Sequence, residues 1–210
     1  DGSGDYLTIA DSSDWDFGND SFTIDLWVYR DTIGDNKDII SKRNASTSSF
    51  LIYADRTNYL LYASSDNVGW DIASGASIGS GDAGEWTHLA VSRNGSTFYL
   101  FKNGVLTGTV SSSLAINNNT YPLRIGHDAG TQYFTGSLDE LRISKGIARW
   151  TANFTPPARE YPLLFSSSGN FTSQVFDAGS SSTWDTLNWT NTSSTGNNIT
   201  FQVMSCDDAS

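Results

Sequence analysis

Residues 85–110, EWTHLAVSRNGSTFYLFKNGVLTGTV, predict three short strands joined by two tight turns. Asn94-Gly95 and Asn103-Gly104 separate runs in which apolar and polar residues alternate. Asn and Gly readily supply the positive φ angles of a type I′ turn, so this stretch favours an antiparallel meander. Apolar side chains fall on both faces of the predicted strands. We therefore expect the meander to be central in its sheet and partly covered on both sides.

The remaining chain predicts an all-β fold. Gly, Ser, Thr and Asn are abundant in the 210 residues, and no long segment shows the 3.6-residue apolar period of a helix. A glycine-rich loop is expected at residues 75–84 and a single helical turn at 146–150. Short strands separated by turns are typical of a sandwich or barrel. Besides the meander, strands are predicted at 6–9, 21–29, 38–42, 49–53, 59–63, 69–72, 123–125 and 134–144.

Charge and hydropathy exclude two classes of partner. The formal net charge is −11 and the sequence pI is about 4.3, so the phosphate backbone of nucleic acid would be repelled. No stretch reaches the roughly 18 apolar residues of a membrane span, so we expect no membrane insertion in this segment. The scattered acids are compatible with a solvated surface or with cation binding.

The chain divides into two unequal parts. Residues 1–161 are predicted to form a jelly roll, residues 162–169 a linker, and residues 170–210 the start of a second β-module that is cut short. The last part is rich in Ser, Thr and Asn and contains three strand-like runs, which are too few for a core of their own. Cys206 is the single cysteine, so an internal disulfide is excluded.

Asn-x-Ser/Thr sequons predict a glycosylated protein of the cell surface or extracellular space. Polar-rich β proteins also accumulate such triplets without using them. Asn153 is the poorest candidate, because Pro156 follows its Thr155. The candidate glycosylation sites are Asn19, Asn44, Asn94, Asn118, Asn170, Asn188, Asn191 and Asn198.

Six stretches follow one another along the chain: DGSGDYLTI, DWDFGNDSFTIDLWVY, DIISKRNASTSSFLIY, EWTHLAVSRNGSTFYLFKNGVLTGT, RIGHDAG and GSLDELRISKGIARWTANFTPP. This ordered set resembles the concanavalin A-like lectin/glucanase superfamily, specifically its laminin G-like and pentraxin-like jelly rolls. The resemblance runs to about Pro157 and implies two packed antiparallel sheets of six or seven strands each. The tail from residue 172 resembles, more weakly, modules that follow such domains in large surface proteins.

Catalytic residues are not predicted. Glucanases of the superfamily use carboxylates at spacings of two or four residues on one strand, and no such set is present. Asp25 stands alone on its strand. Asp139 and Glu140 are neighbours, which point to opposite faces of a regular strand. His88, in the middle of a strand, is expected to be structural. We therefore predict that the domain is not an enzyme.

Calcium is the cofactor that the resemblance implies, because this ion takes oxygen ligands gathered from turns. A structural ion would be held by the Gly2 carbonyl and Asp139, with Asp1 or Asp5 as a further ligand. A second, ligand-bridging site would lie in the loop after RIG, where only Asp128 matches. His127 replaces an oxygen ligand there, and Thr47-Ser48 stands where a pentraxin-type Asp-Asn would fall.

Glycan binding needs exposed aromatic rings beside planar polar groups. Aromatic residues follow one another along predicted strands between residues 49 and 72, and others lie in loops. The alternative is that most of them are ordinary core or covering residues. The candidate ligand-binding residues are Tyr53, Tyr59, Tyr62, Trp70, His127 and Tyr133.

The sequence thus predicts a non-catalytic extracellular recognition or adhesion module, lectin-like, that binds a glycan or a surface protein. The alternative is a structural building block of a cell-surface layer, filament or virion appendage that assembles with itself. A glycoside hydrolase is a distant third.

Overall fold

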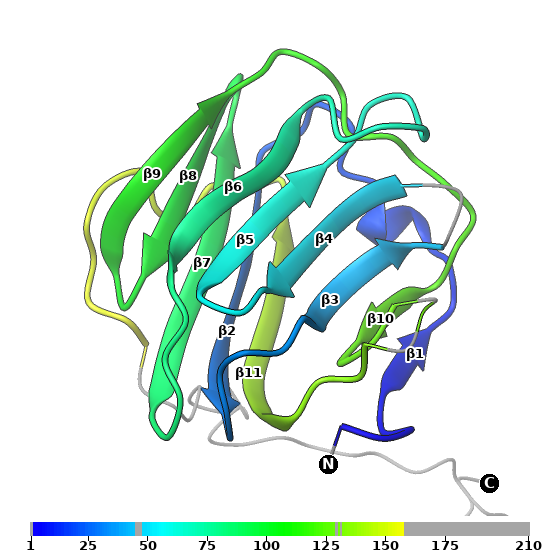
Figure 1. Cartoon of the computed structure of the whole chain (residues 1–210). Helices are drawn as coiled ribbons and strands as arrows, with labels where there is room; N and C mark the ends of the chain where they lie inside the picture. Colours follow the sequence, from blue (N-terminus) through cyan, green and yellow to red (C-terminus); the bar gives the residue numbers. More distant parts are fainter. Residues whose placement is uncertain (1, 45–47, 129, 131, 158–210) are drawn as a thin grey trace, which may run out of the picture. The chain divides into compact units, whose positions relative to one another are not determined.

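The computed structural model describes residues 2–44, 48–128, 130 and 132–157 of the chain. These residues form two stacked antiparallel sheets, which confirms the predicted all-β sandwich (Figure 1). The first sheet has six strands, in the spatial order β1-β10-β3-β4-β5-β6. Their bounds are β1 Leu7–Ile9, β10 Leu123–Ile125, β3 Lys37–Arg43, β4 Ser48–Ala54, β5 Asn58–Ala63 and β6 Ala73–Ser80.

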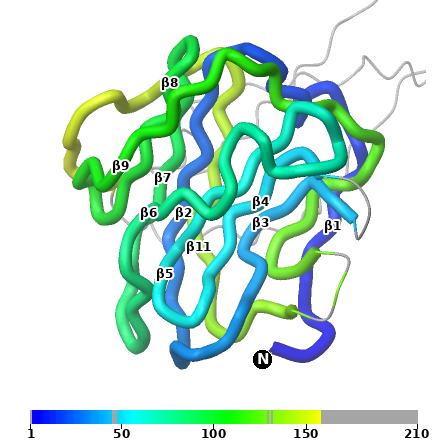
Figure 2. The backbone as a smooth tube through the Cα atoms, turned by 45° about the horizontal axis from the view of Figure 1, so that its top comes forward, coloured from blue at the N-terminus to red at the C-terminus, as the bar shows by residue number. Residues whose placement is uncertain are grey.

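The second sheet has five strands, in the order β11-β2-β7-β8-β9, whereas the resemblance implied six or seven in each sheet. A short 3-10 helix, Ser13–Trp15, lies before β2. At one end of the sandwich β6 of the first sheet contacts β8 and β9 of the second (Figure 2). The bounds are β11 Gly136–Lys145, β2 Phe22–Arg30, β7 Trp86–Asn94, β8 Thr97–Lys102 and β9 Val105–Ser111.

The core lies between the two sheets and follows the period of two expected for strands. On β2 the inward side chains include Leu26 and Val28, both fully buried. On the facing sheet Ile52 of β4 and Leu61 of β5 point into the same cluster. The side chains between them along each strand therefore point to the outer face of their sheet, and this alternation places the candidate site described below.

Only part of the meander is central as predicted: β7 lies between β2 and β8, whereas β9 is the edge strand of the sheet. Leu89 and Val91 of β7 belong to the core. His88 points to the outer face of the sheet and is nevertheless fully buried. Both faces of β7 are therefore covered, as the apolar residues on both sides of this strand predict.

The two turns of the meander differ. Asn103 and Gly104 have φ angles of 50° and 76°, which is the predicted type I′ pattern. In the first turn Asn94 pairs with Thr97 as part of the ladder, so Gly95 is a central residue and Asn94 is not. Gly95 alone has a positive φ there, the pattern of a type II′ turn. The prediction of a type I′ turn at Asn94-Gly95 is therefore wrong.

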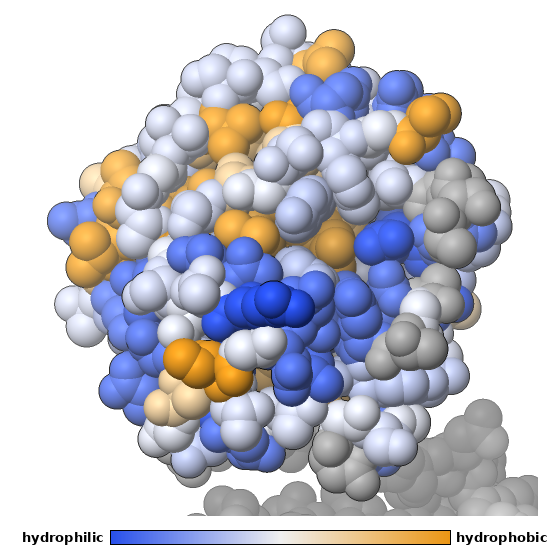
Figure 3. Space-filling model, viewed as in Figure 1, coloured by the Kyte–Doolittle hydropathy of each residue, from blue (hydrophilic) through white to orange (hydrophobic). Residues whose placement is uncertain are grey.

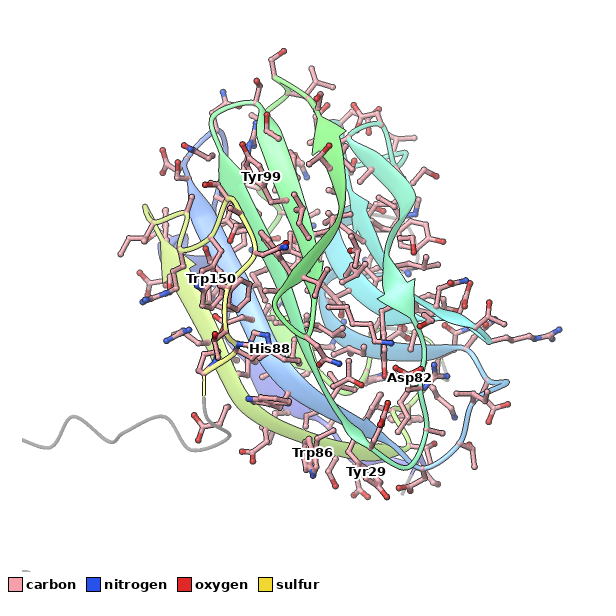
Figure 4. The ribbon with its side chains drawn as sticks, turned by 90° about the vertical axis from the view of Figure 1, so that its left-hand side faces the viewer. Tyr29, Asp82, Trp86, His88, Tyr99 and Trp150 are labelled. Carbon is pink, nitrogen blue, oxygen red and sulfur yellow. The ribbon has the colours of Figure 1, made fainter. Side chains whose placement is uncertain are left out.

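The segment 146–157, which we call the strap, crosses the outer face of the five-stranded sheet (Figure 4). Its residue Trp150 lies over His88, with ring centroids 6.0 Å apart. Phe154 N donates a hydrogen bond to Gly104 O of the second hairpin turn. Residues 147–150 form no helix, so the predicted helical turn is wrong. The strap forms hydrogen bonds with the sheet instead of within itself.

Strand β6 corrects a third local prediction. Sequence patterning placed a strand at 69–72 and a loop at 75–84, whereas the strand runs from Ala73 to Ser80 and pairs with β5. Its sequence, ASGASIGS, is made almost wholly of small residues, so it lacks the large alternating side chains that mark a strand. Gly75 and Gly79 have positive φ angles, and the ladder with β5 shifts register twice.

The predicted linker at 162–169 and second module at 170–210 lie outside the described residues. Within the described ranges, no helix is long and apolar enough to cross a membrane.

Candidate functional site

Three aromatic rings meet on the outer face of the six-stranded sheet. Tyr53 of β4 and Tyr62 of β5 alternate with the core residues of their strands and so point outward. Their ring centroids are 6.1 Å apart with planes nearly perpendicular, the edge-to-face arrangement that aromatic pairs prefer. Trp70, from the β5–β6 connection, lies 5.3 Å from Tyr62. Three of the predicted ligand-binding residues therefore form one surface.

A polar wall stands beside these rings. It belongs to the connection between β10 and β11, which hydrogen bonds hold over β3. Ser41 Oγ donates to His127 O at 3.1 Å, and Asp38 N donates to Gln132 O at 3.2 Å. The connection thus brings the Gln132 side chain next to the three aromatic rings, which we call the floor.

Arg43, near the end of β3, joins the wall to the floor. Its Nη1 lies 3.0 Å from Asp128 Oδ2, and its guanidinium lies 5.7 Å from the centre of the Trp70 ring. Arginine in this position can stack on the indole while it donates hydrogen bonds sideways. The side chain of Arg43 is therefore positioned before any ligand arrives.

The space beside these rings is an open hollow of about 210 Å³. Enclosed sites for small molecules are typically larger, roughly 300–1,000 Å³, so this hollow suits one unit of an extended ligand better than a whole cofactor. Hydrophilic and hydrophobic residues are mixed over this face of the molecule (Figure 3). We call the hollow the aromatic site; its lining residues are Arg43, Leu51, Tyr53, Tyr62, Trp70 and Gln132.

Two buried carboxyl groups, Asp38 and Asp128, adjoin the aromatic site: Asp38 is opposite Tyr53 in the β3–β4 ladder, and Asp128 pairs with Arg43. Burial, and then the Asp128 carboxylate, raise the pKa of Asp38 to about 7, while Arg43 acts in the opposite direction. Neither oxygen of Asp38 meets hydrogen-bond geometry within the described part of the chain. Burial and the neighbouring Asp38 also raise the pKa of Tyr53 to about 12, so its hydroxyl stays protonated and can donate a hydrogen bond.

Tyr59 does not share this surface, contrary to the prediction. It is fully buried in the core, on the same face of β5 as Leu61, and its hydroxyl donates to Asp82 O at 3.5 Å. The prediction treated the tyrosines of β5 alike, but Tyr59 and Tyr62 are three residues apart and therefore lie on opposite faces of a strand.

His127 and Tyr133 form a separate stack next to the wall. Their rings are parallel and 4.2 Å apart, and Tyr6 packs against His127 at 4.9 Å. Burial lowers the pKa of His127. Neither residue lines the hollow, so the structure assigns them to the support of the wall rather than to the predicted ligand surface.

The predicted calcium ligands are placed as follows. Asp128 lies in the wall, where its carboxylate already accepts from Gly130 N and Arg43. Asp139 lies at a β-bulge of β11, and its Oδ1 accepts from Glu140 N. The part of the chain that the structure describes contains no group of three His, Cys, Asp or Glu side chains suited to a metal.

A calcium ion at either predicted place would therefore depend on main-chain and water oxygens. The free oxygens of Asp38 fit a hard cation, but Asp128 would first have to release Arg43. At the amino-terminal place, Gly2 packs against Thr135, and Asp5 lines a separate hollow of about 430 Å³ between β1, β10 and β11. Calcium binding through Gly2, Asp5, Asp139 or Asp128 stays a prediction, which the effect of EDTA on the melting temperature would check.

The predicted glycosylation sites also differ in their surroundings. Asn94 is exposed at the end of β7. Asn19 and Asn118 are exposed but bonded: Asn19 Oδ1 accepts from Arg93, and Asn118 Nδ2 donates to Asp16 at 2.6 Å. Asn44 is half-buried. Asn170, Asn188, Asn191 and Asn198 lie outside the described residues.

Sequence reasoning missed Asp38 and Gln132. One signal was present, because the predicted pairing of 38–42 with 49–53 around a short loop sets Asp38 opposite Tyr53, and this register is observed. The proximity of Asp128 and Gln132 to β3 depends on the path of a long connection, for which the sequence carries no local pattern.

Two stacked antiparallel sheets around one core define a jelly-roll β-sandwich. A family model described as the concanavalin A-like lectin/glucanases superfamily, of laminin G type, matches residues 1–152. The chain belongs to this superfamily. No curated protein sequence matches it.

Solved structures share the fold at low sequence identity. Domain 4 of AbnA, an extracellular arabinanase of family GH43 from Geobacillus stearothermophilus in complex with arabinotriose, is 19% identical, with a TM-score of 0.53 over 67% of this chain and 66% of that one. A putative carbohydrate binding protein from Bacteroides ovatus is 14% identical, with a TM-score of 0.50 over 71% of this chain and 42% of that one. The chain thus spans about two thirds or less of these structures.

Proposed function

We propose that the described domain is a non-catalytic recognition module that binds a glycan at the aromatic site. The observation that carries the proposal is the joint placement of Tyr53, Tyr62 and Trp70 on one outer surface beside Arg43 and Gln132. A sugar ring presents a C–H face that packs on aromatic rings and hydroxyls that bond to planar polar groups. The aromatic site offers both.

The relatives support the same class of ligand. The arabinanase domain was solved with arabinotriose, and the Bacteroides protein carries the description of a carbohydrate binding protein. The first of these domains is one domain of a GH43 enzyme. A non-catalytic role of the present domain is therefore compatible with a catalytic domain in the same protein. An extracellular location follows as part of this proposal, since such glycans lie outside the cell.

The carboxyl groups of the domain do not favour hydrolysis. Glycosidases hold two carboxyl groups roughly 5–9.5 Å apart on either side of the bond to be cleaved. Asp38 and Asp128 interact directly with each other, and neither lines the hollow. Asp25, on the other sheet, is held in an ion pair with Arg142.

Isothermal titration with glycans selected on an array tests the proposal. The double variant Tyr62→Ala/Trp70→Ala should bind at least about tenfold more weakly, a loss of ~1.4 kcal/mol. A matched control exists on the other sheet, where Tyr29 and Trp86 form a pair of similar geometry, 5.6 Å apart (Figure 4). Tyr29→Ala/Trp86→Ala should bind like the unchanged domain. Equal losses in both variants, or no glycan bound, would overturn the proposal.

A second candidate function rests on strand β1. This edge strand of the six-stranded sheet carries Leu7 and Ile9 at 65% and 40% exposure, next to Tyr6 at 47%. An exposed apolar edge strand favours pairing with another chain. We therefore keep the structural building block as the alternative function. Concentration-dependent assembly that Leu7→Glu abolishes, in the absence of any glycan binding, would support it over the first proposal.

A further inference from the structure

The three rings of the aromatic site are inclined to one another, so they do not form a flat platform. The planes of Tyr62 and Trp70 meet at 58°, and those of Tyr53 and Tyr62 meet at 85°. When two ring planes differ by such angles, a flat surface can lie against the face of only one of them. The floor is therefore shaped to contact a ligand from more than one side.

The inclination of Trp70 is held by the β5–β6 connection that carries it. Asp66 Oδ1 accepts hydrogen bonds from two main-chain N–H groups of the turn just before the indole, at 2.9 and 3.0 Å. Asp71, just after the indole, accepts from Ser65 N at 2.7 Å and from Ser65 Oγ at 2.5 Å. The main chain is thus fixed on both sides of Trp70, and the guanidinium of Arg43 lies over the ring.

The direction of the Tyr62 ring is set by its neighbours on both sides. Toward β6, a Cβ added to Gly75 would lie 3.1 Å from the Tyr62 hydroxyl oxygen, so the ring lies close to the main chain of that strand. Toward β4, Tyr53 meets Tyr62 edge to face. A rotation of Tyr62 into the plane of Trp70 would disturb this arrangement, which aromatic pairs prefer. The angle between the two rings is therefore present before any ligand binds.

We infer that the aromatic site binds a single soluble glycan chain and does not bind the surface of a crystalline polysaccharide. This inference rests on the proposed function and names the ligand class of the same site. A sugar unit of a soluble chain is accessible from several sides, so it can enter the angle between Tyr62 and Trp70 and contact both rings. The units of a crystalline polysaccharide are packed in flat layers, whose exposed face can contact one of these rings at most.

The polar groups of the site favour the same ligand. Gln132 and Arg43 line the hollow together with the rings, so a sugar unit must enter the hollow to reach them. The Gln132 side chain also interacts with the Tyr53 hydroxyl, and Arg43 is oriented by Asp128 at 3.0 Å. These planar groups can bond to the hydroxyls at the edge of an inserted sugar ring. In a crystalline layer those hydroxyls are bonded to neighbouring chains instead.

Sedimentation and affinity electrophoresis of the 210-residue chain test the inference. Microcrystalline cellulose and α-chitin should remove no more of it from solution than of serum albumin. Gels that contain soluble arabinan, xylan, mixed-linkage β-glucan or amylose should retard it in at least one case. Tyr62→Ala/Trp70→Ala should abolish the retardation, with an affinity at least about tenfold lower in titration calorimetry. Tyr29→Ala/Trp86→Ala should be retarded like the unchanged chain.

The part played by the ring angle is tested at Asp71. Asp71→Ala removes the acceptor for Ser65 and loosens the loop that presents Trp70, so the affinity for the soluble polysaccharide should fall at least about threefold. Asp71→Asn keeps a side-chain oxygen that can accept from Ser65 N and should bind like the unchanged chain. Equal affinities of Asp71→Ala and the unchanged chain would contradict the inference, because the angle would then not depend on this loop.

The remaining results separate this inference from the proposed function. Sedimentation with a crystalline polysaccharide that Tyr62→Ala/Trp70→Ala abolishes would leave the proposed function intact and remove only the inference. Absence of binding to any soluble or crystalline polysaccharide would remove both. Retardation that survives in Tyr62→Ala/Trp70→Ala would place the glycan elsewhere on the domain and would also remove both.

Discussion

Asp25 of β2 and Arg142 of β11 form a two-point ion pair on the outer face of the five-stranded sheet. Arg142 Nε lies 3.0 Å from Asp25 Oδ1, and Nη2 lies 2.9 Å from Oδ2. Asp25 is fully buried, with His88 Nε2 also 3.4 Å from its Oδ2. Trp150 of the strap covers Arg142. The single acid on this strand therefore has a structural role.

Arg142→Met should destabilise the domain strongly. The substitution keeps the apolar stem but leaves the Asp25 carboxylate buried without its two-point partner, which typically costs about 3–5 kcal/mol. Urea unfolding measures the loss. Lys145→Met, on the same strand at an exposed position, should change stability little. A similar stability of the two variants would show that the ion pair contributes nothing beyond the surface charge.

The two hairpin turns provide a second prediction with an internal control. Gly95 and Gly104 both have positive φ, so alanine is strained at either position, by roughly 1–2 kcal/mol. At Gly104 an added Cβ would also lie 2.0 Å from Phe154 O of the strap, whereas at Gly95 it would meet nothing. Gly104→Ala should therefore lose clearly more stability than Gly95→Ala in thermal unfolding. Hydrogen exchange at Phe154 N should also accelerate in Gly104→Ala alone, and equal effects of both variants would contradict this account.

Lys42 is a fully buried cation in a cage of oxygen atoms. Its Nζ donates to Asp11 Oδ1 at 2.5 Å and to Asn119 O at 2.6 Å, with Asp16 Oδ1 at 3.6 Å. Lys42→Met keeps the length of the side chain but leaves these oxygens without the ammonium. We expect a loss of about 3–5 kcal/mol in urea unfolding. Lys37→Met, at the half-buried start of the same strand, is the control, and an equal loss there would argue against a special role for the cage.

The elements that sequence patterning predicts well are those whose evidence is local. The meander carries alternating apolar residues and Asn-Gly pairs within 26 consecutive residues, so its three strands follow from sequence alone. Its place in the sheet does not, because β9 is an edge strand. Strand β6 shows the limit of this reasoning. Its small residues pair with the free edge of β5. Which strand has a free edge depends on the tertiary structure, so this pairing cannot be predicted from the local sequence.

The candidate site shows the same division. The outward direction of Tyr53 and Tyr62 follows from the period of two, and Trp70 follows them closely in the chain. Asp38 and Asp128 are 90 residues apart in sequence, and their contact depends on how the β10–β11 connection folds over β3. Tertiary placement of this kind leaves no periodic signal, so the carboxyl pair could not be predicted.

Asp38 should make the stability of the domain depend on pH even without a ligand. The pKa of its carboxyl is about 7 in the folded chain and 3.8 in its ordinary state, so the folded chain binds more protons between these values. Stability from this group is therefore fully present below about pH 4, falls as pH rises to about 7 and is constant above, a total of ~4 kcal/mol at most. Asp38→Asn does not titrate and should become progressively more stable than the unchanged domain over this interval. Urea unfolding at pH 4, 5, 6, 7 and 8 measures the difference in the free energy of unfolding between the two proteins. The contributions of the acids that both proteins share cancel in this difference. Asp20→Asn, at an exposed acid, is the control. A difference for Asp38→Asn that does not change with pH would mean that the pKa of Asp38 is not raised in the folded chain.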